Sequence, residues 1–259
     1  MSPHVLLIGG HGKIAQLLTP LLLLRNWTVT SLIRTPSQIP TITALSPGSG
    51  TLHTLVRSLE DIQSQSDAQS IIDAIKPDYI VFSAGAAGKG GPARTFAIDR
   101  DAATHFVRAA VATPSVTKFL LVSYLASRRK KPEWWDDEAW AVARKLNEEV
   151  MPAYYQAKVV ADEVLYEAAK GREGFVAIDL RPGTLTSEPA AKVELGKTKG
   201  SEGEVSRESV ARVADALLAS EGVGNVWLDL LDGEEDVDKA VERVVRESVD
   251  AAEGEDVAA

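Results

Sequence analysis

The chain has 259 residues, of which 45% are hydrophobic and 25% charged, with a formal charge of −9 and no cysteine. The hydrophobic share is enough for a core, which excludes a wholly disordered chain. Without cysteine there is no disulfide framework, no Cys-ligated metal and no thiol nucleophile. The longest apolar runs, such as residues 21–24, are too short to span a membrane, and no leader precedes the first strand. We therefore expect a soluble, cytoplasmic protein with no membrane partner.

Seven apolar, β-rich runs alternate with segments of helical periodicity. Each run is continuously apolar, as expected of strands that are covered on both faces. Strand–helix alternation of this kind is typical of βαβ units. We therefore predict an α/β fold with a doubly wound parallel sheet. The runs are residues 4–8, 28–33, 53–57, 79–83, 118–123, 175–180 and 226–230.

The chain shows no repeat and no Gly/Ser linker, so we expect one domain over residues 1–231. Two stretches without periodicity, 128–137 and 185–204, are predicted to form a small cap. In residues 232–259, valines recur on one helical face, which predicts an amphipathic helix and a tail, packed on the domain or trailing from it. That segment has a formal charge of −8 and leaves −1 for the rest. Its acidity favours solubility or contact with a protein partner.

The first predicted strand ends in a glycine-rich turn, GGHGKIA, at residues 9–15. Such a turn, between a buried strand and a helix, lets backbone N–H groups approach a pyrophosphate. The spacing is GxxGxxA rather than GxGxxG, and a P-loop is excluded because Ile14 follows Lys13. An ordinary glycine-rich turn is the alternative. The candidate phosphate-binding residues are Gly9, Gly10, His11, Gly12, Lys13 and Ile14.

The end of the second predicted strand bears on the type of dinucleotide. A carboxylate about 20 residues after the turn binds a ribose 2′-hydroxyl, whereas an arginine there accommodates a 2′-phosphate. This strand is followed by Arg34 and Thr35, with no Asp or Glu. Arg34 therefore favours NADP(H) over NAD(H), and a solvated surface arginine is the alternative.

Further motifs follow the glycine turn in chain order. They are residues 83–91 (SAGAAGKGG), 99–101 (DRD), 121–124 (LVSY), 154–158 (YYQAK) and 181–183 (RPG). In this order, they resemble the short-chain dehydrogenase/reductase superfamily, specifically its atypical branch of NAD(P)H-binding, NmrA-like proteins. Uncharacterised fungal members look most similar, since they share a Trp-rich insert like Trp134-Trp135 and an acidic C-terminal helix. The resemblance covers most of the chain and implies a Rossmann-like fold.

Tyr154 and Lys158 form a candidate catalytic pair. Four residues apart on a helix, they lie on one face, and Pro152 suits the first turn of that helix. A nearby ammonium stabilises a phenolate, which is expected to lower the pKa of Tyr154 and make it a usable acid or base. Ser123, at the end of the fifth strand, is expected to hydrogen-bond the substrate oxygen. Tyr155 is the alternative to Tyr154, although its spacing from Lys158 is three residues.

The resemblance implies further cofactor contacts. It places Lys158 on the nicotinamide ribose, the loop after the fourth strand along the cofactor, and the loop after Arg181 beside the nicotinamide. The sequence after the third strand departs from the family because it lacks the Asp-Leu pair often found at the adenine pocket, where Ser58 is a candidate replacement. The residues concerned are Ser58, Leu59, Ser83, Ala84, Gly85, Pro182, Gly183 and Thr184.

Other polar clusters have simpler interpretations. The four histidines lack metal-ligand spacing, so no metal site is expected. The basic run 128–131 is followed at once by acidic residues, which favours a solvated loop over a nucleic-acid site. Residues 99–101 are predicted to begin a helix. Trp134 and Trp135 either form a lid over the substrate or anchor the insert to the body.

The favoured hypothesis is an NADPH-dependent oxidoreductase that reduces a small carbonyl or quinone-like compound. Tyr154 would be its proton donor, Lys158 the electrostatic partner and Ser123 the ligand of the substrate oxygen. Two alternatives remain open. One is a non-catalytic NADP(H)-binding redox sensor of the NmrA-like type, and the other is a nicotinamide-dependent epimerase or isomerase. The substrate itself cannot be read from the cap loops.

Overall fold

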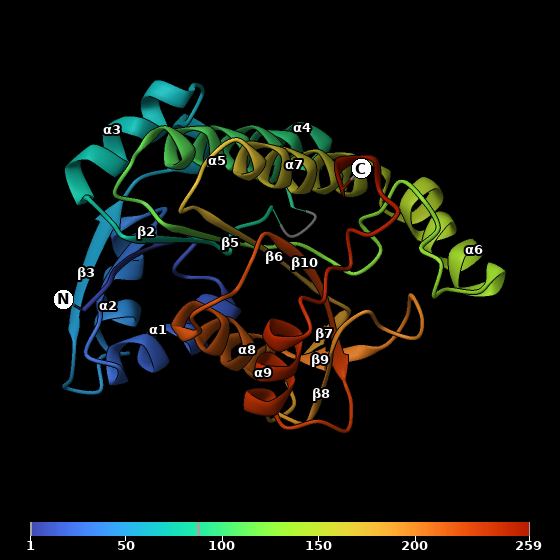
Figure 1. Cartoon of the computed structure of the whole chain (residues 1–259). Coiled ribbons are helices and arrows are strands. Elements are labelled where there is room, and N and C mark those ends of the chain that lie inside the picture. The colour runs from blue at the N-terminus through green and yellow to red at the C-terminus, as the bar shows by residue number, and fades with distance from the viewer. Residues whose placement is uncertain (1, 87–88, 259) are drawn as a thin grey trace.

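A computed structural model describes residues 2–86 and 89–258, so Ala87 and Gly88 of the predicted cofactor loop lie outside the described residues. The main sheet has the strand order β3-β2-β1-β4-β5-β6-β10-β8 (Figure 1). The strands are β1 (His4–Ile8), β2 (Thr28–Ile33), β3 (Thr51–Val56), β4 (Tyr79–Phe82), β5 (Lys118–Val122), β6 (Val176–Pro182), β8 (Val193–Gly196) and β10 (Val226–Asp232).

All neighbours in this sheet pair in parallel except β8 and β10. The seven predicted strands are confirmed, with bounds that differ by no more than two residues at each end. The chain winds outward in one direction from β1 to β3 and in the other from β4 to β10. The order therefore reverses between β1 and β4, where their carboxyl ends at Ile8 and Phe82 lie side by side. Ligands of doubly wound sheets bind at such a point.

Helices cover both faces of the sheet (Figure 1). Helices α1, α8 and α9 pack together on one face, and α3, α5 and α7 on the other. No helix among the described residues is long and apolar enough to cross a membrane. The helices are α1 (Lys13–Leu24), α2 (Ile39–Thr43), α3 (Gln65–Ile75), α4 (Gly91–Thr95), α5 (Ala103–Ala112), α6 (Asp137–Lys145), α7 (Pro152–Lys170), α8 (Arg207–Ala219) and α9 (Val237–Arg246).

Shorter helical segments surround the carboxyl end of the sheet. The 3-10 segments η1 (Pro36–Gln38) and η2 (Leu59–Asp61) follow β2 and β3, and η5 (Asp256–Ala258) lies near the C-terminus. Two π-helical segments, η3 (Phe96–Ala102) and η4 (Leu146–Val150), continue α4 and α6. Short π-helical stretches are rare and are often found at functional sites.

The predicted cap over residues 185–204 is partly absorbed into the main sheet. Its β8 pairs antiparallel with β10, because Val193 and Leu195 alternate inward and are buried there. Two other short strands, β7 (Thr184–Thr186) and β9 (Glu204–Ser206), form a separate parallel pair. Strands of three or four residues are too short to show periodicity in the sequence, which is why this segment was expected to be irregular.

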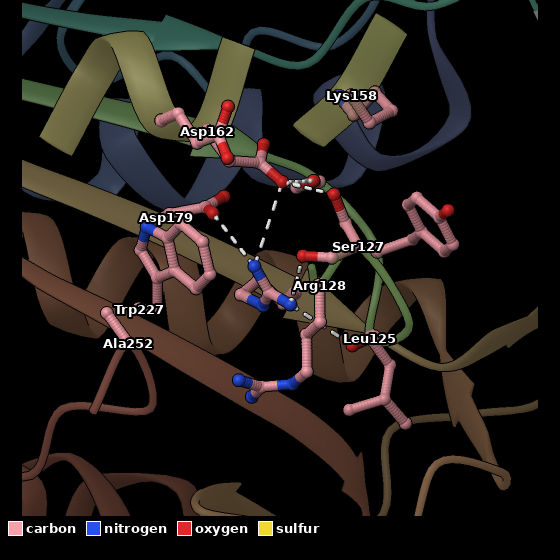
Figure 2. A network of polar contacts seen from close by, with 12 residues as sticks. Leu125, Ser127, Arg128, Lys158, Asp162, Asp179, Trp227 and Ala252 are labelled. Carbon is pink, nitrogen blue, oxygen red and sulfur yellow. Dashed lines mark hydrogen bonds and ion pairs between the residues drawn. The ribbon is translucent and has the colours of Figure 1, made fainter. Parts of the chain in front are cut away.

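A cluster of buried charges lies between the sheet and the C-terminal segment, and we call its five residues the arginine cluster. Asp229 Oδ2 accepts from Arg128 Nη2 at 2.5 Å, and Asp229 Oδ1 accepts from Arg181 Nε at 3.0 Å. Arg181 Nη1 also lies 3.5 Å from Asp179 Oδ2 and 3.7 Å from Asp162 Oδ2 (Figure 2). All five side chains are at most 1% exposed.

The prediction of a solvated loop for residues 128–131 is therefore wrong at Arg128. Its guanidinium carbon lies 5.4 Å from the ring centroid of Trp134 and 5.0 Å from that of Trp135, and Nη1 donates to Ala251 O at 2.7 Å. Lys130 pairs with Asp256 in the same C-terminal segment. The basic run thus holds the acidic C-terminal segment. The neutralising carboxylates come from distant positions as well as from the adjacent residues.

We predict that Asp229→Ala strongly destabilises the fold. The substitution leaves two buried guanidinium groups without their shared carboxylate, and breaking a buried ion pair costs about 3–5 kcal/mol. The free energy of unfolding, measured by urea denaturation, should fall by about this amount. Asp256→Ala is the control, because the Asp256 side chain is 77% exposed and such pairs contribute about 0–1 kcal/mol. Similar losses in both variants would contradict the prediction.

Candidate functional site

A large cleft of about 1680 Å³ opens at the carboxyl ends of the strands. Every residue that the sequence analysis assigned to the site lines this cleft, except Gly10. Those residues are Gly9, His11, Gly12, Lys13, Ile14, Arg34, Ser58, Leu59, Ser83, Ala84, Gly85, Ser123, Tyr154, Lys158, Pro182, Gly183 and Thr184. Gly10 instead packs against β2, where its N–H donates to Leu32 O and a Cβ would lie 1.7 Å from Ser31 Oγ.

The glycine turn has the geometry of an anion-binding cradle. Gly9 has a φ of +83°, and a Cβ there would lie 2.7 Å from Ala84 Cα. Helix α1 begins directly after Gly12, and its first turn contains no acidic residue. The N-terminus of a helix carries partial positive charge and free N–H groups. Because Gly9 has no Cβ, the turn packs closely against Ala84. The free N–H groups at the start of α1 could then bind a diphosphate.

The cleft wall beside the turn carries three exposed cations. Arg34 follows β2, and Arg57 follows β3 on the neighbouring strand, where Ile33 pairs with Val56. Lys13 is the first residue of α1. None of their charged groups makes an ion pair with a described residue, whereas Arg94 in the same wall pairs with Glu60. Arg57 was not singled out by the sequence analysis, although its place directly after a strand was a usable signal.

Local hydrogen bonds position the loops of this wall. Gln38 Oε1 accepts from the backbone N–H groups of Arg34 and Thr35, at 2.9 and 3.2 Å, so the turn after β2 is closed. Ser58 Oγ accepts from Glu60 N at 3.3 Å and thereby caps η2. Ser58 therefore has a structural role beside its place on the cleft wall.

Helix α7 brings Tyr154 and Lys158 to the other end of the cleft. The Tyr154 hydroxyl makes no hydrogen bond with a described residue, and its ring packs 5.0 Å from that of Tyr124. The Tyr155 hydroxyl, by contrast, donates to Arg128 O at 3.0 Å, and Tyr155 does not line the cleft. Of the two adjacent tyrosines, only Tyr154 can present its hydroxyl to a bound molecule.

The electrostatics of Tyr154 differ from the expectation. Burial, followed by the charges of Asp99 and Asp162, raises the pKa of Tyr154 above its ordinary value. The predicted lowering of the Tyr154 pKa is not seen, because burial and the two carboxylates set the direction of the shift. The Lys158 ammonium donates to Val122 O at 2.7 Å. Tyr154 therefore holds its proton at neutral pH and can act as an acid.

Ser123 lies on the cleft wall at the end of β5, but its hydroxyl is already committed. Ser123 Oγ donates to Asp162 Oδ2 at 2.8 Å, and Asp162 is fully buried on α7. Asp162 was missed from the sequence, although it follows Tyr154 and Lys158 at the same spacing of four residues. A carboxylate on the buried face of a helix was the signal that could have identified it.

Asp99 is a second missed residue, and the prediction that residues 99–101 begin a helix is wrong. Asp99 lies inside η3, is 1% exposed and lines the cleft. Its Oδ2 accepts from Ala86 N at 2.9 Å, while Oδ1 has no hydrogen-bond partner among the described residues. Burial is the main cause of a raised pKa at Asp99, and Lys158 opposes it. The π-helical register turns this carboxyl inward, which a period of 3.6 residues cannot indicate.

The insert after β5 supplies an apolar wall at the end of the cleft near Tyr154. Val142, Leu146 and Val150, from α6 and η4, face it. Trp134 and Trp135 do not line the cleft, and Trp135 is buried with Nε1 donating to Thr198 O at 3.0 Å. Of the two alternatives for these tryptophans, the structure supports the anchor and not the lid.

Comparisons with known proteins agree with this geometry. A family model described as NAD(P)H-binding matches residues 9–221. The UPF0659 protein C216.03 of Schizosaccharomyces pombe is 29% identical, covering 90% of this chain and 91% of its own length. YhfK of Bacillus subtilis, named as an uncharacterized sugar epimerase, is 28% identical over 93% of this chain and 99% of its own. A putative NAD-dependent epimerase/dehydratase from Bacillus halodurans has the same fold, with a TM-score of 0.75 at 23% identity, covering 93% of this chain and 100% of its own.

We predict that Asp99→Asn raises the stability of the protein in a pH-dependent way. The folded-state pKa of Asp99 is raised, so the native state gives up stability as the pH rises through that value. Asparagine does not titrate. The free energy of unfolding of the variant should therefore exceed that of the native protein by more at pH 7 than at about pH 4, the ordinary pKa of an aspartate. Asp101→Asn, at a side chain that is 44% exposed, should show no such trend. If Asp99→Asn changed the free energy of unfolding equally at both pH values, burial would not be the cause of the raised pKa of Asp99.

Proposed function

The chain belongs to the NAD(P)H-binding family, and from this premise we propose that it is an NADPH-dependent oxidoreductase that reduces a carbonyl or quinone-like compound. The observation that carries the proposal is the unbonded hydroxyl of Tyr154, held protonated on the wall of a dinucleotide-sized cleft. A proton donor there, one helical turn from Lys158, suits a reaction that places a proton on a substrate oxygen.

Three parts of the cleft lining support the binding of a phosphorylated dinucleotide. The N-terminus of α1, directly after Gly12, would hold the diphosphate through its free backbone N–H groups. Arg34 and Arg57 would bind a 2′-phosphate, because guanidinium groups pair with phosphate in a bidentate way. Lys158 keeps two donors beyond its bond to Val122 O, and these would bind the ribose hydroxyls beside the nicotinamide.

The proposed reaction is a balanced two-electron reduction. When bound, NADPH supplies the hydride for the carbonyl carbon. Tyr154 gives its phenolic proton to the carbonyl oxygen, so the product is an alcohol. The ammonium of Lys158 lies one turn away and stabilises the phenolate that Tyr154 becomes. The apolar wall of Val142, Leu146 and Val150 would receive the substrate's hydrocarbon part.

A nicotinamide-dependent epimerase is the second candidate. The names of the Bacillus subtilis and Bacillus halodurans proteins favour it. An epimerase returns its hydride to the substrate and consumes no NADPH overall, so net loss of nicotinamide absorbance separates the two. A redox sensor would bind the dinucleotide without either turnover. Screening NADPH oxidation against a panel of carbonyls and quinones, with product analysis, tests all three.

We predict that NADPH binds more tightly than NADH and that Arg34 and Arg57 cause the difference. Each arginine removed should weaken NADPH binding by about tenfold, since a hydrogen bond to a charged group contributes about 1.5–3 kcal/mol and part of this is lost to solvent at an exposed site. NADH affinity should stay unchanged. Calorimetry with Arg34→Ala and Arg57→Ala measures both.

Arg212→Ala is the matched control for these titrations, because Arg212 lies on α8 and does not line the cleft. It should alter neither affinity. Equal affinities of the native protein for NADPH and NADH would show that Arg34 and Arg57 do not bind the 2′-phosphate.

We also predict that Tyr154→Phe lowers the turnover number by at least about a hundredfold while leaving NADPH affinity nearly unchanged. The phenol is the proton donor, whereas its ring contributes only packing against Tyr124. Tyr155→Phe is the control, since it removes a neighbouring hydroxyl that bonds Arg128 O. Steady-state kinetics on a substrate from the panel provide the readout. A Tyr154→Phe enzyme that keeps its full rate would rule out the catalytic assignment.

A further inference from the structure

Two serine hydroxyls converge on one carboxylate oxygen behind the cleft wall. Ser123 Oγ donates to Asp162 Oδ2 at 2.8 Å, and Ser127 Oγ donates to the same atom at 2.5 Å. Ser123 lines the cleft, whereas Ser127 does not. Asp162 is a member of the arginine cluster, and Figure 2 shows it close to Ser127. The single proton of each hydroxyl is therefore turned away from the cleft.

The surroundings of Asp162 keep this arrangement fixed. Its side chain is fully buried, and Arg181 Nη1 lies 3.7 Å from Oδ2. Arg181 is itself held by Asp229 at 3.0 Å and by the carbonyl of Ser127 at 2.7 Å. The other oxygen of Asp162, Oδ1, has no hydrogen-bond partner among the described residues. A proton on the carboxyl is therefore accommodated at Oδ1, and Oδ2 stays an acceptor for both serines.

Ser123 consequently offers the cleft a lone pair and no proton. A ketone oxygen can accept from Tyr154 but finds no second donor at Ser123. An alcohol oxygen can accept from Tyr154 and donate to Ser123 at the same time. A site that bonds a hydroxyl group rejects an analogue that lacks it, because a buried polar group is then left unpaired.

We propose that Asp162 is a positioning residue that fixes Ser123 as a hydrogen-bond acceptor, so that the cleft selects a hydroxyl-bearing molecule over the matching carbonyl compound. The inference rests on the proposed function, in which the alcohol is the product of reduction and the substrate of the reverse reaction. It revises the expected role of Ser123, which becomes a ligand for a hydroxyl proton rather than a donor to a carbonyl. The substrate class is a secondary alcohol with an apolar body, matching the wall formed by α6 and η4.

Binding of a matched probe pair tests the inference without a known substrate. Cyclohexanol and cyclohexanone are titrated separately against the full chain saturated with NADP⁺, and saturation-transfer NMR gives the two dissociation constants. The native protein should bind the alcohol about tenfold more tightly than the ketone, as expected for one paired hydrogen bond. Equal affinities, a preference for the ketone or binding of neither compound would overturn the proposal.

The chain itself provides a matched pair of variants. Ser123→Ala removes the acceptor from the cleft and should bring the affinity ratio to about one. Ser127→Ala removes the other hydroxyl from the same carboxylate oxygen and should leave the ratio unchanged. A role of Ser123 in packing alone would weaken both probes equally and preserve the ratio. The ratio is therefore the readout that separates positioning from stability.

Asp162→Leu tests the positioning role directly. Without its acceptor, the Ser123 hydroxyl can turn to the cleft and donate a hydrogen bond to a ketone oxygen. The affinity for cyclohexanone should therefore rise relative to that for cyclohexanol. Where this variant fails to fold, the comparison of Ser123→Ala with Ser127→Ala still decides.

Binding of NADP(H) distinguishes a failure of the proposed function from a failure of the inference about Ser123. A native protein that binds no NADP(H) in calorimetry contradicts the proposed function. A native protein that binds NADP⁺ but shows the same ratio in Ser123→Ala and Ser127→Ala contradicts only this inference.

Discussion

The desolvated guanidinium of Arg181 is the interaction on which much of the structure depends. It lies at the end of the central strand β6 and is shared by carboxylates from α7, β6 and β10. The Trp227 ring covers it, with 4.2 Å between the guanidinium carbon and the ring centroid. Burying such a charge is costly unless it is paired and hydrogen-bonded. The strands, the loop after β5 and the C-terminal segment must therefore come together in one arrangement, since each supplies a partner to Arg181 or to its neighbour Arg128.

Helix α7 connects this cluster with the site. Tyr154, Lys158 and Asp162 follow one another at intervals of four residues, so one face of the helix passes from the cleft into the arginine cluster. Lys158 is anchored on Val122 O and Asp162 on the two serines. The chemistry-bearing end of the cleft is thus built on rigid elements, which is what a site needs if its groups are to keep productive distances.

A feature of this structure can be predicted from the sequence when neighbouring residues determine it. The strands, the glycine turn and the position of Tyr154 and Lys158 on one helix are local patterns, and the structure has these elements where they were expected. The ion pair of Arg128 with Asp229 joins positions 101 residues apart, so no pattern around the basic run indicates it. Charged residues inside apolar strands, such as Asp179 and Asp229, are a visible sign that partners exist but do not identify them.

Asp99 shows a different limit. Its burial follows from the π-helical segment η3, which shifts the phase of the helix from that of α4. A carboxylate next to a predicted helix is expected in the first helical turn, because negative charge is stabilised at the helix N-terminus. The cost of burying it without a partner for Oδ1 is visible only when the neighbouring backbone is known. Local sequence patterns therefore do not identify a buried carboxylate of this kind.

The balance of charge along the cleft gives the bound molecule an orientation. At the end near β2 and β3, the cations Lys13, Arg34 and Arg57 have no ion-pair partner among the described residues. At the end near α7, Lys158 faces the carboxyls of Asp99 and Asp162, so its charge is offset there. Unbalanced positive charge attracts phosphate over several ångströms, while the offset end does not compete for it. This distribution of charge supports the proposed orientation, in which the phosphorylated adenosine of the dinucleotide would lie toward the cations and the nicotinamide beside Tyr154.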